Sequence, residues 1–165
     1  MPATVTAGSL IGGPLTDLKI GVDASEVSVG PTLAPLRWRK ETTWIDYRVE
    51  QKRGIIKKEE ATTRYYISTV VAHATLENLR IALNQIAANL SGSTLTVDED
   101  VLGQQSLLAE GPGPSGLTRT LDFPIVVSMA TGDIVTIEQS GQQGFPVEFE
   151  VLQNPSTGAW FTVLN

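Results

Sequence analysis

The sequence predicts a mainly β protein, a β-sandwich or barrel of about eight strands with one flanking α-helix. Apolar and polar residues alternate in several short stretches, and this is the period of a half-buried strand. Only one stretch, at about 76–90, has the spacing of an amphipathic helix. Fifteen glycines and nine prolines punctuate the 165 residues, of which only 18% are charged. This length favours a single domain over residues 1–165.

The predicted strands follow one another between turn residues. Leu18, Ile20 and Val22 alternate with polar or small residues, as a strand with one buried face requires. Residues 1–14 are rich in Gly and Thr and lack periodicity, so we expect them to form a loose arm. Further strands are predicted at Val27–Val29, Ile45–Gln51, Thr62–Val71, Thr94–Val97, Leu121–Met129, Ile134–Glu138, Phe145–Val151 and Ala159–Leu164.

The helix has a start signal, an apolar stripe and a stop signal. Thr75 is placed to accept a hydrogen bond from an amide of the first turn, and Glu77 complements the helix dipole. Gly92 is suited to a left-handed C-terminal position. We expect the stripe to pack against a β layer; its members are Leu76, Leu79, Leu83, Ile86 and Leu90.

The chain has few of the residues that catalytic and metal sites need. It lacks cysteine, which excludes disulfides and thiolate zinc sites, and His73 is its single histidine. No serine and carboxylate stand out as partners for His73, so a structural histidine is favoured over a general base. Residues 98–100 (Asp-Glu-Asp) are interpreted as a solvated turn rather than a cation site, and the glycines of 111–116 as a plain loop. We therefore expect no enzyme activity, metal or cofactor.

Charge is unevenly distributed along the chain, whose net charge is −6. Residues 37–64 contain nine bases and five acids, whereas residues 82–165 contain nine acids and a single base, Arg119. The acidic total argues against tight DNA binding, which requires a dominant basic face. The N-terminus lacks the pattern of a signal peptide, and no apolar run is long enough for a membrane segment.

Residues 36–60 are predicted to form a long charged loop that interleaves bases, acids and two tryptophans. A docking arm is the favoured interpretation, because Trp and Arg are enriched at protein–protein hot spots. A solvated loop and a nucleic-acid platform remain open alternatives. The residues proposed to dock on a neighbouring subunit, or on the next ring of an assembly, are Arg37, Trp38, Arg39, Lys40, Trp44, Lys52, Arg53, Lys57 and Lys58.

The order of several features resembles the tail tube proteins of long-tailed bacteriophages, which are related to the tubes of contractile injection systems. An early strand pair (Leu18–Val29) precedes the long charged connection, and Gly-Ile-Ile-Lys-Lys-Glu-Glu from Gly54 leads into a strand at Tyr65–Val71. Ala-Thr-Leu-Glu-Asn-Leu from Ala74 then marks a strand-to-helix step. The chain ends in the hairpin sequence Phe-Pro-Val-Glu-Phe-Glu-Val-Leu, a turn and Ala-Trp-Phe-Thr-Val-Leu.

This resemblance implies a structural protein of the virion tail, made in the cytoplasm of the bacterial host. Its partner would be itself, in hexameric rings that stack into a tube for the passage of double-stranded DNA. Other tail proteins would adjoin it: a sheath or terminator, the baseplate or tip, and the tape measure. An acidic wall repels phosphates, so we expect acids of the C-terminal half to line the lumen, with Glu148 and Glu150 as candidates.

Three alternatives remain open. The chain would equally suit the tube of a bacteriocin or a type VI-like injection system. A β-sandwich binding module would need exposed aromatic residues on one face, and Trp38, Trp44 and Trp160 are scattered in sequence. A hydrolase would need a catalytic partner for His73.

Overall fold

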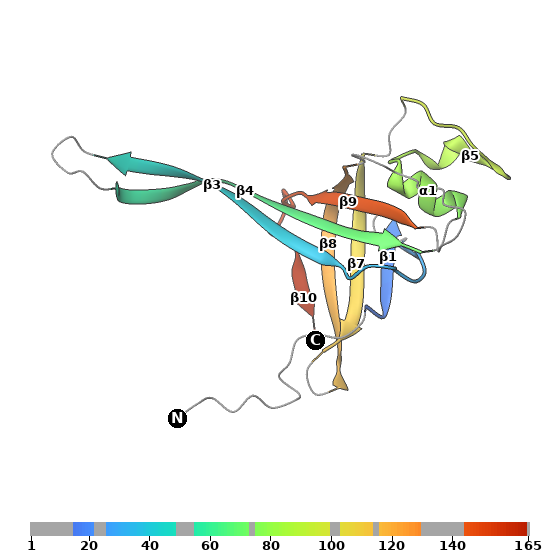
Figure 1. Ribbon diagram of the computed structural model, residues 1–165, viewed down its shortest axis with the longest axis horizontal. Coiled ribbons are helices and arrows are strands. Elements are labelled where there is room, and N and C mark those ends of the chain that lie inside the picture. The colour runs from blue at the N-terminus through green and yellow to red at the C-terminus, as the bar shows by residue number, and fades with distance from the viewer. Residues whose placement is uncertain are drawn as a thin grey trace.

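The fold is described from a computed structural model, which describes residues 15–21, 26–48, 55–72, 75–99, 103–113, 116–129 and 144–164. Figure 1 shows a β-rich body from which one long hairpin projects. The elements are β1 (Asp17–Gly21), β2 (Val27–Ser28), β3 (Arg37–Arg48), β4 (Ile55–Val71), α1 (Leu76–Ala82), the 3₁₀ turn η2 (Ala87–Asn89), β5 (Leu90–Ser91), β6 (Thr94–Leu95), β7 (Gln104–Pro112), β8 (Thr118–Ser128), β9 (Phe145–Val151) and β10 (Thr162–Leu164).

Eight strands form one antiparallel sheet that bends into two layers. Its order is β2-β1-β7-β8-β9-β4-β3, with β10 paired to β8. The bend lies in β8, which pairs with β10 at Thr120–Asp122 and with β9 at Val126–Ser128. In Figure 1, β4 and β9 lie across β1, β7 and β8. The predicted mainly β, sandwich-like class is confirmed, and the described strands do not close into a barrel.

The core lies between these two layers. In β9 every second residue from Phe145 to Val151 is buried, as the alternation predicts. Ile67 and Val71 of β4 lie on the same inner face, and the other layer contributes Leu18 of β1. The inner faces also contain Ile20, Leu107, Ala109, Phe123, Val126 and Phe149. Burial of these side chains is the main stabilising term of the body.

The helix is shorter than the predicted 76–90, and its buried face differs from the predicted stripe. Thr75 caps it as expected, since its side chain accepts a 3.1 Å hydrogen bond from the amide of Asn78. The helix ends at Ala82 because the chain turns at Asn84, whose φ of 57° is left-handed. Beyond this turn the periodicity no longer defines one face. Ile81 and Ala82 are buried, whereas Leu79, Leu83, Ile86 and Leu90 are half-buried and Leu76 is exposed.

Gly92 also has a different role from the predicted one. Its φ of 57° is left-handed, but it lies in the turn between β5 and β6 instead of at the helix end. The predicted strand at Ile134–Glu138, His73 and the arm 1–14 lie outside the described residues. In the part of the chain that the structure describes, no helix is long and apolar enough to cross a membrane.

The prediction of a long charged loop at 36–60 is wrong, although the strand predicted at Ile45–Gln51 agrees with β3 over its described residues, 45–48. β3 and β4 occupy most of this segment and pair with each other from Arg37↔Ser68 to Arg48↔Ile55. Thr, Trp, Ile and Tyr residues between the charges favour strands, and opposite charges on facing residues make the pairing favourable. The register shifts between Thr43 and Trp44, and again between Tyr47 and Arg48, so the hairpin contains two irregularities.

Candidate functional site

The candidate site is the part of the β3–β4 hairpin that leaves the body. β4 pairs with β9 only from Tyr65 to Val71, so residues 55–64 pair with β3 alone. We define the arm as Glu41–Arg48 with Ile55–Arg64. It projects away from both layers in Figure 1. A hairpin of two strands without a third partner is marginally stable in water.

Ion pairs and hydrogen bonds connect the two strands of the arm. Lys40 at its base lies 2.9 Å from the Glu60 carboxylate, and the hydroxyls of Thr42 and Thr63 donate hydrogen bonds to the same carboxylate. The Thr63 hydrogen bond, followed by the Lys40 contact, holds the pKa of Glu60 below its ordinary value. The hydrogen bond to Glu60 in turn raises the pKa of Lys40. Nearer the tip, Lys58 lies 3.6 Å from Asp46.

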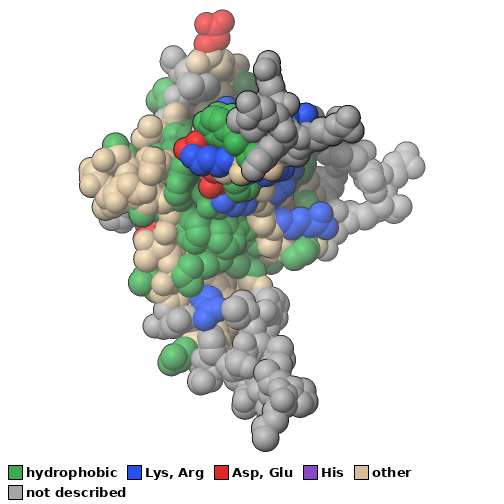
Figure 2. Space-filling model, turned by 90° about the vertical axis from the view of Figure 1, so that its left-hand side faces the viewer, with side chains coloured by type: hydrophobic (Ala, Val, Ile, Leu, Met, Phe, Trp, Pro, Cys, Tyr) green, Lys and Arg blue, Asp and Glu red, His purple; other side chains and the backbone are tan. Residues whose placement is uncertain are grey.

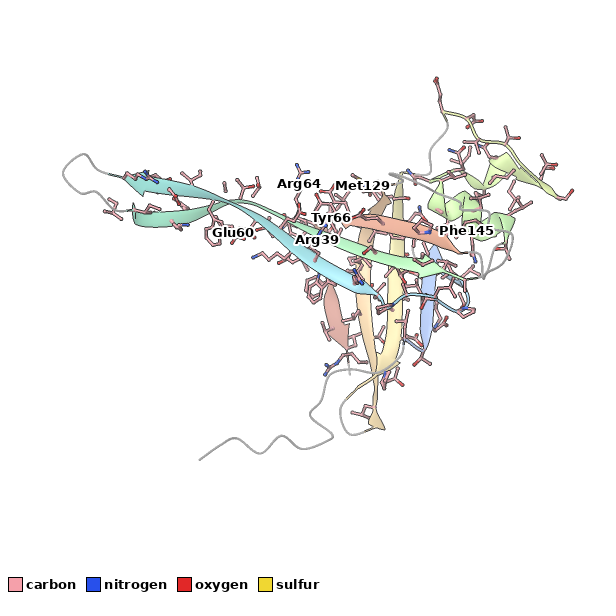
Figure 3. All side chains as sticks on the ribbon, viewed as in Figure 1. Arg39, Glu60, Arg64, Tyr66, Met129 and Phe145 are labelled. Carbon is pink, nitrogen blue, oxygen red and sulfur yellow. The ribbon has the colours of Figure 1, made fainter. Side chains whose placement is uncertain are left out.

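A second charged row crosses the outer face of β3, β4 and β9 where the arm leaves the body. Arg39 lies 3.3 Å from Glu41 and 3.2 Å from Glu148, and its guanidinium lies over the Tyr66 ring. Arg64 lies 3.8 Å from Glu150. Figure 3 shows Arg39, Arg64 and Tyr66 close together in this region. The row therefore pairs two guanidinium groups with three carboxylates and has an excess of one negative charge.

Glu148 and Glu150 lie in this row, on the face of β9 opposite the core, as the alternation predicts. Their carboxylates contact the guanidinium groups of Arg39 and Arg64. They are thus partly neutralised within the chain. Whether they line a lumen stays a prediction.

Several large apolar side chains of the arm are exposed. In the described chain they contact the partner strand but no core. Lys57 lies over the Tyr47 ring at 5.4 Å, so this cation covers only one of them. Apolar residues gathered on one projecting element are typical of an interface. Five such residues are between 42% and 53% exposed: Trp44, Ile45, Tyr47, Ile55 and Ile56.

An aromatic cluster lies at the base of the arm. Trp38 packs edge-on against Phe161 with ring centroids 4.5 Å apart, and Tyr65 lies 5.4 Å from Trp160 and 5.8 Å from Phe161. Trp38 is nevertheless 45% exposed. Figure 2, which views the molecule from the side of the arm, shows apolar surface on the body next to it. Two tryptophans that are scattered in sequence thus converge on Tyr65.

The structure places the sequence-predicted docking residues in different environments. Arg39, Lys40, Lys57 and Lys58 have carboxylate partners within the chain. Arg39 and Lys40 thus already contact carboxylates of their own chain, and their docking on a neighbouring subunit stays a prediction. Trp44 is on the arm and Trp38 in the aromatic cluster. Arg37 has no ion pair among the described residues, and Lys52 and Arg53 lie outside them.

Sequence reasoning missed the apolar residues of the arm. Ile45, Tyr47, Ile55 and Ile56 were not among the predicted docking residues, which were all Arg, Lys or Trp. The signal was present for Ile45 and Tyr47, because they alternate with polar residues in the strand predicted at Ile45–Gln51.

Comparisons with known proteins assign this chain neither a family nor a function. The chain matches no protein-family model and no curated protein sequence. A similar solved structure is a chain described as "Virion of native gene transfer agent (GTA) particle". It is 11% identical, the match covers 90% of this chain and 96% of that one, and the TM-score is 0.45. At this similarity the likeness assigns no function, and the proposals below depend on the residues of this chain.

Proposed function

We propose that this protein is a structural, non-enzymatic component of a virion: a tail tube protein whose copies form stacked hexameric rings. The tube would conduct double-stranded DNA and adjoin the other tail proteins. The observation that carries the proposal is the arm, a projecting hairpin with five exposed large apolar side chains. The rings, the tube and the location in the tail come from the sequence resemblance.

The energetics of the arm support an intermolecular role. Its ion pairs are exposed, and exposed pairs contribute little to stability. Burying its apolar side chains against another subunit would instead contribute roughly 25 cal/mol for each Å² removed from water. The arm therefore gains most of its stabilisation when a partner covers it.

Charge makes the arm a poor DNA-binding element. Its lysines are paired with carboxylates of the same hairpin, so few cations remain to neutralise phosphates. An apolar hairpin with balanced charge suits a protein partner better.

The free edges of the sheet also favour assembly. β2 and β3 are the terminal strands of the described sheet, and β3 presents a twelve-residue edge. Unpaired edges of this length tend to associate with other chains. In a head-to-tail ring each subunit covers the edge of the next one, so no edge remains free.

Negative-stain electron microscopy of the purified protein tests the proposal. We expect rings or tubes for the wild-type chain and their loss in Ile45→Glu/Ile56→Glu, which places two charges in the apolar surface of the arm. Leu117→Glu is the matched control, because Leu117 is 56% exposed on the body and lies on neither the arm nor an edge strand. A wild-type chain that stays monomeric at all concentrations contradicts the proposal.

The aromatic cluster favours a second candidate function, a binding module. Trp38, Tyr65, Trp160 and Phe161 form an aromatic group that is partly open to solvent, as apolar or sugar ligands require. Titration with oligosaccharides, followed by tryptophan fluorescence, tests this function. A saturable change that is lost in Trp38→Ala would support it, and an unchanged spectrum would contradict it.

A further inference from the structure

Most charges of the described chain are balanced internally, but four described residues are not: Arg37, Arg48, Glu99 and Asp122. Two of these, Arg37 and Glu99, lie beside apolar surface. The other carboxylates and cations of the arm and of the row beside it contact one another. Among the described residues, neither Arg37 nor Glu99 has an opposite charge within 4.0 Å. Each is a charge of opposite sign available to a second molecule.

Arg37 lies at an apolar pocket. The pocket has a volume of about 370 Å³ and forms where the segment before β3 meets β4, β9 and the end of α1. Glu148 also lines it, but its carboxylate contacts Arg39, which leaves the Arg37 guanidinium without a partner. The pocket therefore suits an apolar side chain with a carboxylate beside it. Its apolar lining includes Pro35, Val70, Ala82, Met129 and Val147.

The turn after β6 presents such a pair of groups. Val97 is 59% exposed, and Glu99 lies two residues further on and is also exposed. Between them, Asp98 is held to the body by the buried Gln85. The Gln85 side chain accepts a 3.1 Å hydrogen bond from the Asp98 amide and donates one of 3.3 Å to its carbonyl.

A further hydrogen bond fixes the side chain of Asp98. The Asn89 amide donates to the Asp98 carboxylate at 2.7 Å, and its nitrogen also donates to Gln85. The middle residue of the turn is thus anchored while its neighbours Val97 and Glu99 are presented to solvent. A turn that is ordered before binding loses less conformational entropy on docking.

We infer that Val97 and Glu99 of one copy dock into the Arg37 pocket of a second copy. The Glu99 carboxylate would pair with the Arg37 guanidinium, and Val97 would cover the apolar lining. Pocket and turn are different surfaces of the same chain, so the contact can propagate head to tail. The inference depends on the proposed self-assembly and names a contact in it that is separate from the arm.

Cross-linking tests the contact directly, because the chain has no cysteine of its own. Ser68 lines the pocket, so a Ser68→Cys variant reports on the pocket side of the contact. This variant is mixed with a Val97→Cys variant and treated with a short bismaleimide. A bismaleimide cross-link has less demanding geometry than a disulfide. We expect a covalent heterodimer on a denaturing gel from this mixture. Leu117→Cys mixed with Val97→Cys is the matched control, because Leu117 is exposed outside the pocket and the edge strands, and should give only the background of random collisions.

A charge exchange tests the pairing itself. We expect Arg37→Glu and Glu99→Arg each to lower the assembled fraction about tenfold, because each places like charges together. Combining the two should restore assembly. The mismatched combination Arg48→Glu/Glu99→Arg should not, since Arg48 lies at the far end of β3.

The outcomes separate this contact from the proposed function. A wild-type chain that forms rings or tubes, while the Ser68→Cys and Val97→Cys mixture gives no more dimer than the control, overturns the contact and leaves the proposed function standing. Single charge variants that assemble normally also overturn it, as does a double charge reversal that fails to restore the assembly lost in the single variants. A chain that forms neither assemblies nor cross-linked dimers overturns both.

Discussion

The body and the arm contain the same kind of antiparallel pairing but differ in what stabilises them. In the body, strands bury large side chains between two layers, and Phe149 is completely inaccessible. In the arm, almost every side chain of β3 is exposed, and ion pairs and threonine hydroxyls connect the strands. The body therefore contains its own stabilising core, whereas the arm lacks one. This difference is the basis of the proposal that another molecule covers the arm.

The first prediction compares one large side chain from each region. Phe149→Ala should destabilise the free subunit by roughly 3–5 kcal/mol, because it leaves a cavity in the core. Trp44→Ala should change stability by no more than about 0.5 kcal/mol, because Trp44 is exposed on the arm. Urea unfolding of both variants measures the difference.

Equal losses for the two variants would contradict this comparison. They would mean that the arm is packed as tightly as the body in the free subunit.

The second prediction concerns Gly144, which lies just before β9 and packs closely against β4. A Cβ at Gly144 would lie 2.6 Å from a methyl of Val70, 2.7 Å from a methyl of Leu33 and 3.0 Å from the Val71 carbonyl oxygen. Gly144→Ala should therefore destabilise the protein by roughly 1–3 kcal/mol, measured by thermal unfolding. Adding Leu33→Ala should recover part of this loss. If Gly144→Ala alone unfolds at the same temperature as the wild type, then Val70 and Leu33 can move aside to accommodate the added methyl group at little cost.

The third prediction uses a half-buried carboxyl of the body. Burial, followed by the nearby charge of Glu26, raises the pKa of Asp122. Ionising Asp122 therefore costs free energy in the folded state. This cost is absent below the ordinary carboxyl pKa of about 3.9 and complete above the raised value.

Asp122→Asn should accordingly stabilise the protein at pH 7 and leave it unchanged near pH 3. Thermal unfolding at the two pH values measures this. A variant that is less stable than wild type at pH 7 would show that Asp122 has a favourable partner.

The smallest effect is expected for an exposed carboxylate of the arm. The pKa of Glu60 is lowered by Thr63 and Lys40, so its contribution is present at neutral pH and is lost as the pH falls through that lowered value. Glu60→Gln should speed hydrogen exchange in residues 41–48 at pH 7 without changing the unfolding midpoint. The exchange difference should vanish at low pH, and a difference independent of pH would exclude the ion pair as its cause.

The sequence predicted several strands of the body, because burial there follows local periodicity, but it missed the central strand β7, whose end at Gly111 and Pro112 was interpreted as a loop. The alternation in Phe145–Val151 matches β9 residue for residue, and Leu18 and Ile20 are buried as expected. The helix end could not be predicted in the same way. Its position is set by the left-handed Asn84 and by the buried Arg80, which pairs with Glu77 and donates to the Gln85 carbonyl. These are local contacts at the end of the helix that the spacing of apolar residues does not reveal.

The sequence identified where in the chain the candidate site lies, but it did not predict that the site is a paired hairpin. Residues 36–60 were identified as a docking segment, but their charges suggested a loop. Opposite charges such as Lys58 and Asp46 face each other only once the strands are paired, so charge counts along the sequence cannot show this balance. The aromatic cluster was missed for the same reason, since Trp38 and Trp160 are far apart in the chain.

Hydrogen exchange of the arm, compared between the free subunit and the assembled protein, tests the central claim most directly. If another subunit covers the arm, amides of residues 41–48 and 55–64 should exchange at least about tenfold more slowly after assembly, while core amides of β9 change little. Equal exchange of the arm in assembled and free protein would contradict the claim that the arm is an assembly element.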